Sequence, residues 1–212
     1  MSEAVKPGGK RGEQARRTRR RIIDAGAVLF IENGYAATTL DQVAQRAGVA
    51  VQTVYFHFGN KRTVLKEAVD VAAVGDDEPI PLLDRPWVVQ IRAESEPRRI
   101  VELWVHYGRD IFKRVAPIMR VVRDAAAMDP DMAEQWETNQ LQRATAFGVL
   151  AQLLADKDAL KPGMSVTEAT DIIFTLLSIE VYLLLTVTRG WTPARWEPWV
   201  VSALTDSLLR GH

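Results

Sequence analysis

The chain of 212 residues contains no cysteine and only three histidines. Without cysteine it can form no disulfide, no thiolate metal site and no cysteine nucleophile. The sequence also lacks a G-x-S-x-G segment, a Walker loop and a G-x-G-x-x-G loop. Glu102 and His106 are four residues apart, but the paired Glu-x-x-His sequences of di-metal helical bundles do not occur. We therefore predict no catalytic residue, no metal site and no cofactor, and we expect a protein that is not an enzyme.

The chain also has no net charge, because 27 basic side chains balance 27 acidic ones. The distribution is uneven, since residues 10–21 contain seven basic side chains and one acid, leaving 20 basic against 26 acidic side chains elsewhere. This pattern predicts a cationic N-terminal segment on an acidic body. Glycine and proline near the start predict a disordered basic arm over residues 1–14. From Arg16 onward the arginines run into an apolar helical stripe, where ordered cations can bind phosphates without reading sequence.

No apolar stretch follows the charged N-terminus, so the sequence predicts no signal peptide, and we expect a cytoplasmic protein. Residues 172–187 are nearly all apolar. This segment is shorter than the roughly 20 residues that span a bilayer, and Glu180 lies in its middle. We therefore predict a helix buried within protein and no membrane partner.

The stretch from Thr39 to Lys61 predicts two short helices separated by a glycine. Thr39 is a favourable N-cap, and Gln42 follows at the spacing of a capping box. Apolar residues then recur at helical spacing until Gly48, which can adopt the left-handed conformation that ends a helix. The sequence therefore predicts a first short helix that begins at Leu40 and a sharp turn at Gly48.

The second short helix combines an apolar face with an outer face of mixed polar and aromatic groups. The apolar positions recur at the spacing that packs a helix onto a core: Val51, Val54, Tyr55 and Phe58. The outer face carries groups able to contact base edges in a major groove or the phosphates beside it: Gln52, Thr53, Phe56 and His57. The alternative is a pair of ordinary core helices, but it does not explain aromatic groups on both faces. The pattern favours a helix-turn-helix.

Five segments of this region form a distinctive set: Leu29-Phe30, Gly34-Tyr35, Ala47-Gly48-Val49, Thr53-Val54-Tyr55-Phe56-His57-Phe58 and Asn60-Lys61. Their identities and spacing resemble the N-terminal domain of the TetR family of bacterial transcriptional regulators over about residues 16–69. The resemblance implies an all-α chain in which a three-helix DNA-binding domain precedes a helical domain for dimerisation and ligand binding. One position departs from the family. Ala50 stands where serine or threonine is usual, and a missing cap costs about 1 kcal/mol of local stability.

The expected partner of the N-terminal domain is a double-stranded DNA operator. We expect Gln52, Thr53 and Phe56 to read bases, while Tyr55, His57 and Lys61 hold the backbone. In the family the start of the first helix lies over the DNA backbone. The complete set of predicted DNA contacts is Arg17, Arg20, Thr39, Ala50, Gln52, Thr53, Tyr55, Phe56, His57 and Lys61.

The remaining sequence predicts helices and no sheet. We place a DNA-binding domain over residues 15–73, an irregular proline-containing linker over 74–97 and a helical domain over 98–212. Helix starts are marked by prolines, several of them behind a capping residue. The predicted helices of this part are 98–115, 117–128, 130–155, 166–188 and 193–209.

In the resembled family the second domain forms the dimer and encloses a small-molecule effector. An apolar stripe predicts a homodimer interface, although the same residues could form an intramolecular core: Ile179, Tyr182, Leu183, Trp196, Val200, Leu204 and Leu208. Aromatic and polar side chains on the middle helices could line an effector pocket, although aromatic residues at helical spacing are more often plain core: Trp104, Tyr107, Phe112, Trp136, Asn139, Arg143 and Phe147.

Three functions fit the sequence. We favour a dimeric, ligand-responsive regulator that acts as a repressor at a palindromic operator. A sequence-nonspecific DNA-packaging protein would also use the N-terminal arginines. A small-molecule carrier or an enzyme built from the C-terminal bundle is the third.

Overall fold

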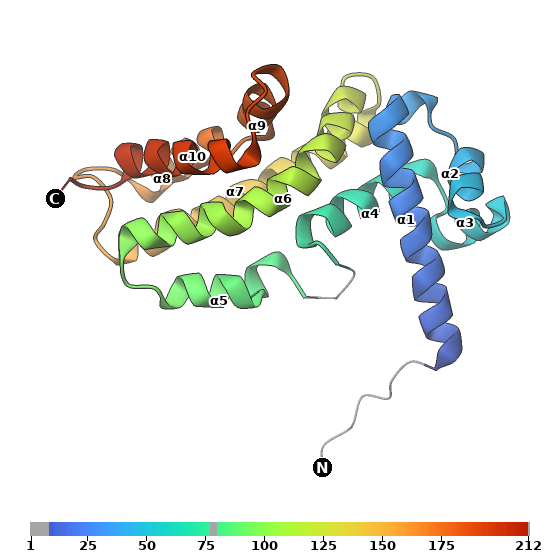
Figure 1. Cartoon of the computed structure of the whole chain (residues 1–212), viewed down its shortest axis with the longest axis horizontal. Coiled ribbons are helices and arrows are strands. Elements are labelled where there is room, and N and C mark those ends of the chain that lie inside the picture. Colours follow the sequence, from blue (N-terminus) through green and yellow to red (C-terminus); the bar gives the residue numbers. More distant parts are fainter. Residues whose placement is uncertain (1–8, 77–79, 212) are drawn as a thin grey trace, which may run out of the picture. The chain divides into compact units, whose positions relative to one another are not determined.

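The computed structural model describes residues 9–76 and 80–211, and its regular structure is helical apart from one isolated bridge between Leu160 and Leu209 (Figure 1). The prediction of an all-α chain is confirmed. The chain divides into two compact units, Met1–Asp70 and Val71–His212. The division lies inside helix α4, Lys61–Val74, and not in the segment 74–97 that we predicted as a linker.

The first unit contains α1 (Lys10–Ala37), α2 (Leu40–Ala47), α3 (Val51–Phe58) and most of α4. Helix α1 already begins at Lys10, so the prediction that the disordered arm extends to residue 14 is wrong; residues 1–8 lie outside the described residues. Gly34 has φ 79° and interrupts α1.

The core of the first unit is formed by the apolar faces of its four helices. Ile22, Phe30, Val43, Val54 and Leu65 come from α1 to α4 and have almost no exposed surface. Helix α2 contacts both α1 and α3. The core therefore holds α3 by one side and leaves its other side free for contact.

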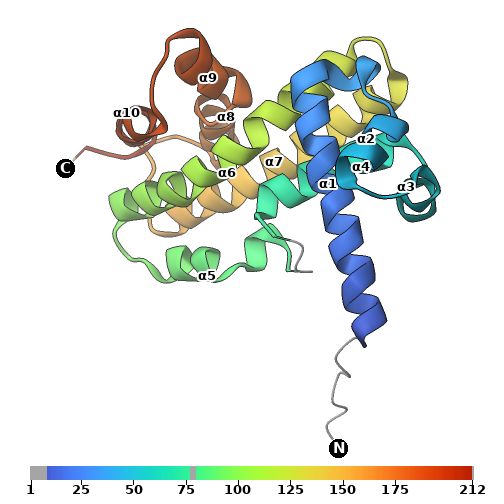
Figure 2. The same cartoon turned by 45° about the vertical axis from the view of Figure 1, so that its right-hand side comes forward.

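The second unit consists of a layered helical bundle (Figures 1 and 2). Helix α6 packs on α7, α7 packs on α8, and α10 covers α6 and α8. Its elements are η1 (Leu82–Asp84), α5 (Pro86–Ala93), α6 (Pro97–Ala126), α7 (Pro130–Asp156), α8 (Val166–Leu176), α9 (Ile179–Leu183), the π-helical η2 (Leu184–Thr188) and α10 (Pro193–Leu208).

Prolines mark helix starts in this unit, as predicted. Asp129 caps α7 and Thr192 caps α10, each directly before a proline at the first helical position. The predicted linker is nevertheless not irregular throughout, because Pro86 starts α5, whose Val88 and Ile91 are buried. Proline at a first helical turn costs nothing, since the missing N–H has no partner there.

Two predicted helix boundaries are wrong. Pro117 does not divide α6, which continues through it. An internal proline costs about 3 kcal/mol, and the buried Ala116, Ile118 and Met119 around it provide apolar burial that offsets this cost. Conversely, the predicted helix 166–188 is broken at Leu177, and Ser178 caps a new helix by accepting a bond from the Val181 N–H at 3.1 Å.

The same segment, Val166–Thr188, is long and apolar enough to cross a membrane by length and composition, yet only 28% of its most apolar window is buried inside this chain. We predicted a helix enclosed by protein, but a single chain leaves much of the apolar surface of this segment uncovered.

Most of the predicted dimer-interface residues are internal. Ile179, Tyr182, Trp196, Val200, Leu204 and Leu208 are all at most 5% exposed within one chain. Tyr182 packs against Trp196 at a centroid distance of 5.1 Å, and both contact Phe112 of α6. This corrects the prediction, because buried side chains have no surface to offer a partner; Leu183 alone is partly exposed.

Substitution of Gly26 by alanine tests how closely α1 approaches α4. A Cβ atom at Gly26 would lie 2.6 Å from Cγ1 of the buried Val64, whereas Gly12 in the same helix has nothing within 4 Å. Overpacking costs about 1–3 kcal/mol, which exceeds the gain of up to about 1 kcal/mol in helix propensity. We expect Gly26→Ala to lower the free energy of unfolding in urea and Gly12→Ala to leave it unchanged or raise it. Equal stability of the two variants would contradict this packing.

Candidate nucleic-acid interface

The turn between α2 and α3 is held by three local interactions. Thr39 and Gln42 form the predicted capping box, with Thr39 N–H donating to Gln42 Oε1 at 2.8 Å and Gln42 N–H to Thr39 Oγ1 at 3.2 Å. Gly48 is left-handed at φ 63° and ψ 44°. The Arg21 guanidinium of α1 donates to the carbonyls of Ala47 and Gly48. These bonds satisfy the C-terminal carbonyls of α2 and fix the direction in which α3 begins.

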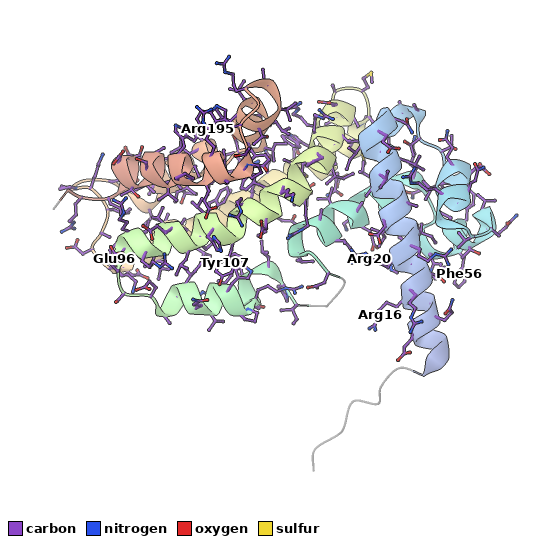
Figure 3. The ribbon with its side chains drawn as sticks, viewed as in Figure 1. Arg16, Arg20, Phe56, Glu96, Tyr107 and Arg195 are labelled. Atoms are coloured by element: carbon purple, nitrogen blue, oxygen red, sulfur yellow. The ribbon has the colours of Figure 1, made fainter. Side chains whose placement is uncertain are left out.

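Helix α3 is buried on one face only. Val54 and Phe58 are buried, whereas Phe56 is 85% exposed and Tyr55 is 53% exposed. Figure 3 shows Phe56 on the outer side of the helix. Tyr55 was predicted to share the core face, and its exposure corrects that assignment. Gln52 is exposed as well, while Thr53 and His57 are half-buried.

The arginines at the start of α1 divide into two groups. Arg16 (Figure 3) and Arg17 lie on the exposed first turns, where the Arg17 guanidinium is 4.0 Å from the Glu13 carboxylate. Arg20 pairs with Asp24 at 2.9 Å. Arg19 is different, because its guanidinium pairs with Glu67 of α4 and lies 4.9 Å from the Phe58 ring centroid. Part of the basic segment is therefore structural.

Two predicted contacts at the ends of α3 have distinct environments. Ala50 is exposed and provides no side-chain cap, as its lack of a hydroxyl predicted. Lys61 is half-buried, with its ammonium donating to the Tyr35 carbonyl at 2.7 Å and lying 4.3 Å from the Tyr35 ring centroid. A phosphate contact by Lys61 stays a prediction, and this internal bond competes with it.

Sequence reasoning missed the structural roles of Arg19, Arg21 and Thr38. Thr38 is fully buried, and its hydroxyl donates to the carbonyls of Gly34 at 2.8 Å and Leu29 at 3.2 Å. These bonds satisfy carbonyls near the break in α1. The sequence indicates these roles only in part. The spacing of the arginines shows which share a helix face, but not which helix that face meets.

The residues predicted to line an effector pocket are distributed among several contacts of the second unit. Trp104 and Tyr107 both contact Trp87 of α5, at centroid distances of 5.8 and 5.3 Å. Trp104 and Phe112 are buried by their aromatic neighbours. Their part in ligand binding stays a prediction.

The polar members of that set lie on α7. Asn139 is buried, accepts from Gln135 Nε2 at 3.0 Å and donates to Gln142 at 3.3 Å. Arg143 is half-buried near Phe147, which is itself buried, and Trp136 is half-buried two turns earlier on the helix. Their part in ligand binding stays a prediction.

A short helix held from one side by a capped partner helix, with exposed aromatic and amide groups on the other side, defines a helix-turn-helix protein. The family model described as "Bacterial regulatory proteins, tetR family" matches residues 22–68, which include this motif. Residues 22–68 therefore form a DNA-binding domain of the TetR family.

Curated relatives match chiefly in the same region. TtgW of Pseudomonas putida, an uncharacterized HTH-type transcriptional regulator, is 46% identical over 57 residues, 27% of this chain and 42% of TtgW. SrpR of the same species is 46% identical over 57 residues, but only 27% of its length is covered. The chain therefore matches less than half the length of either protein. The match with YdeS of Bacillus subtilis (strain 168), also uncharacterized, is longer, with 26% identity over 159 residues and 74% of each chain.

Solved structures match over nearly the whole chain. NalD of Pseudomonas aeruginosa, the secondary repressor of the MexAB-OprM multidrug efflux pump, has a TM-score of 0.70 at 21% identity and covers 93% of this chain and 100% of its own. FadR of Bacillus subtilis in complex with stearoyl-CoA has a TM-score of 0.69 at 18% identity, covering 88% of this chain and 97% of its own. At these identities the likeness shows a shared fold.

Replacement of Ala50 by serine tests whether α3 lacks a cap. Ala50 has the extended backbone of an N-cap, with φ −69° and ψ 145°, but no side-chain acceptor. A serine hydroxyl there should accept an N–H of the first turn and stabilise the protein by about 1 kcal/mol. We expect a higher melting temperature by circular dichroism. The control Ala15→Ser, at an exposed position inside α1, should give no increase, because serine is a weaker helix former than alanine. An equal rise for both variants would contradict the assignment.

Proposed function

We propose that this chain is a dimeric transcriptional repressor that binds a palindromic DNA operator through α3 and responds to a small-molecule effector. The observation that carries the proposal is the exposure of Phe56 and Tyr55 on a two-turn helix. Exposing such large apolar side chains to water is unfavourable. Their position on the second helix of a helix-turn-helix is where a protein of this class contacts the major groove.

Each side chain of the outer face has a chemical role in this proposal. The Gln52 amide can bond an adenine through two hydrogen bonds, and the Phe56 ring can contact a thymine methyl group. Thr53 adds a hydroxyl that can donate or accept. Tyr55, His57 and Lys61, with Arg17 and Arg20 of α1, bind the phosphate backbone and set the register.

A second copy of the chain is needed to read a palindrome. The surface proposed for this contact is formed by η2 and α10, where Leu184, Val187 and Trp199 are 53%, 63% and 37% exposed. Trp199 also contacts Trp191 at a centroid distance of 5.9 Å. Such a cluster buries apolar area in a twofold interface. Two recognition helices can then meet successive major grooves, about 34–36 Å apart.

Helix α4 is the element proposed to couple effector and operator. Its first residue, Lys61, bonds the Tyr35 carbonyl within the first unit. Near its other end the Ala72 carbonyl accepts a bond from Arg114 Nε of α6 at 3.0 Å within the second unit. An effector that shifts α6 would therefore move α4 and change the separation of the two α3 helices. Such a shift needs an effector that binds one arrangement more tightly than the other.

The repressor and effector parts of the proposal have support from proteins of the same fold. NalD is described as a repressor, and FadR was solved with stearoyl-CoA. A sequence-nonspecific DNA-binding protein is the alternative. It is less well supported, because Arg19 and Arg21 make bonds inside the first unit.

Paired substitutions of Phe56 and Arg17 separate base reading from phosphate contact. Phe56→Ala should weaken binding to an operator selected from random DNA by about 1–3 kcal/mol and relax specificity at one base pair. Arg17→Ala should weaken binding to all sequences alike and reduce the slope of log affinity against log salt by about 1. Fluorescence anisotropy at several salt concentrations measures both effects. Equal affinity of the unaltered protein for palindromic and random duplexes at about 0.15 M salt would leave only the nonspecific alternative.

Substitution of Val187 by aspartate tests the dimer surface. A carboxylate placed in an apolar interface is buried without a partner, which strongly disfavours association. We expect Val187→Asp to shift the protein from dimer to monomer in sedimentation equilibrium and to weaken operator binding. The matched control is Val89→Asp, because Val89 is 58% exposed and belongs to α5, which is distant in sequence from η2 and α10. A dimer unaffected by Val187→Asp would place the interface elsewhere.

A further inference from the structure

Arg143 of α7 is a half-buried cation whose hydrogen-bond partners in the described residues are all neutral. Its Nη1 donates to Gln140 Oε1 at 3.0 Å, and its Nη2 makes a long bond of 3.4 Å to the Phe174 carbonyl of α8. Its Nε is buried and has no acceptor among these residues. A guanidinium has five N–H donors and prefers two parallel bonds to one carboxylate. The two bonds to neutral oxygens therefore use only part of what Arg143 can donate.

The electrostatic surroundings agree with this description. Burial lowers the pKa of the Arg143 guanidinium, and the charge of Glu180 offsets part of that effect. Glu180 is itself exposed and lies 3.8 Å from Arg123 of α6, so its charge is shared with a second cation. Among the ion pairs of the described residues, none joins Arg143 to a carboxylate within 4 Å.

Aromatic rings surround the same guanidinium. Its central carbon lies 4.0 Å from the Phe174 ring centroid and 5.9 Å from that of Phe147. Trp136 lies two turns earlier on α7, on the same helix face by spacing, and is half-buried. Cation–π contacts favour this position of Arg143, but they provide no acceptor for its unused N–H groups.

We propose that Arg143 binds the carboxylate of an amphipathic organic acid, whose apolar body packs against Phe147, Phe174 and Trp136, and that this acid is the effector. The proposal rests on the function proposed above, because it names the chemical class of that effector. The carboxylate replaces Gln140 as the acceptor of the guanidinium. The bond to Phe174 ties Arg143 to α8, so a ligand that draws the guanidinium away from this carbonyl also changes the contact between α7 and α8.

The test compares acids with their uncharged equivalents. Alkyl carboxylates from hexanoate to hexadecanoate and the aryl acids benzoate, phenylpropionate and indole-3-acetate are titrated into the full-length protein, each beside its primary amide. Tryptophan fluorescence and isothermal titration calorimetry report binding without DNA. Phenyl phosphate is included to separate a carboxylate site from a phosphate site.

Three variants assign the effect to the guanidinium. We expect at least one acid to bind about 10–100-fold more tightly than its amide, as expected for a charge-assisted bond, and Arg143→Met to abolish that preference. Glu180→Gln should strengthen binding of the same acid, because it removes a nearby negative charge. The matched control is Arg195→Met, since Arg195 (Figure 3) lies 4.1 Å from the Trp191 ring centroid but is exposed. It should leave the preference unchanged.

Several outcomes would overturn the proposal. They are an absence of preference for every acid over its amide, a preference that survives in a folded Arg143→Met protein, and binding of phenyl phosphate but of no carboxylate. Circular dichroism of Arg143→Met establishes that it is folded, and Arg143→Lys, which keeps the charge but loses the planar fork, should retain part of the preference. Operator binding by the ligand-free protein is measured separately, so failure of the regulator function is distinguishable from failure of the carboxylate site.

Discussion

The rest of the first unit depends on one constraint, the turn from α2 into α3 at Gly48. The left-handed backbone of this residue ends α2 and redirects the chain, and the Arg21 guanidinium from α1 occupies the carbonyls that the turn leaves without helical partners. The same turn decides which side of α3 meets the core and which side remains outside. The hydrogen bonds from Arg21 of α1 thus help to set the direction in which α3 begins.

Local patterns in the sequence predicted the elements of this unit well. Three of these features depend only on residues close in sequence, and the structure has all three as predicted. They are the capping box at Thr39, the turn at Gly48 and the lack of a side-chain cap at Ala50. Predictions that depended on tertiary packing were less accurate. Pro117 was expected to start a new helix, but α6 continues through it, because burial around it outweighs the lost hydrogen bond. Ser178 caps a helix inside a segment whose composition favours one continuous helix.

The candidate sites show the same division. Exposure of Gln52 and Phe56 followed from helical spacing, because a two-turn helix can bury only one face. The partners of Arg19 and Arg143 could not be predicted, since Glu67 and Phe174 are distant in sequence and come close only through helix packing. The apolar stripe of α10 was recognised correctly as apolar, but periodicity cannot tell whether the surface it contacts belongs to the same chain or to a second one.

The missing cap at Ala50 links folding to recognition. The first turn of α3 has no side-chain acceptor for its leading N–H groups. A phosphate oxygen placed there would complete that turn and would also benefit from the positive end of the helix dipole. In the proposed complex the duplex would act as the capping group. The same contact would then order the first turn of α3 and raise the affinity for DNA.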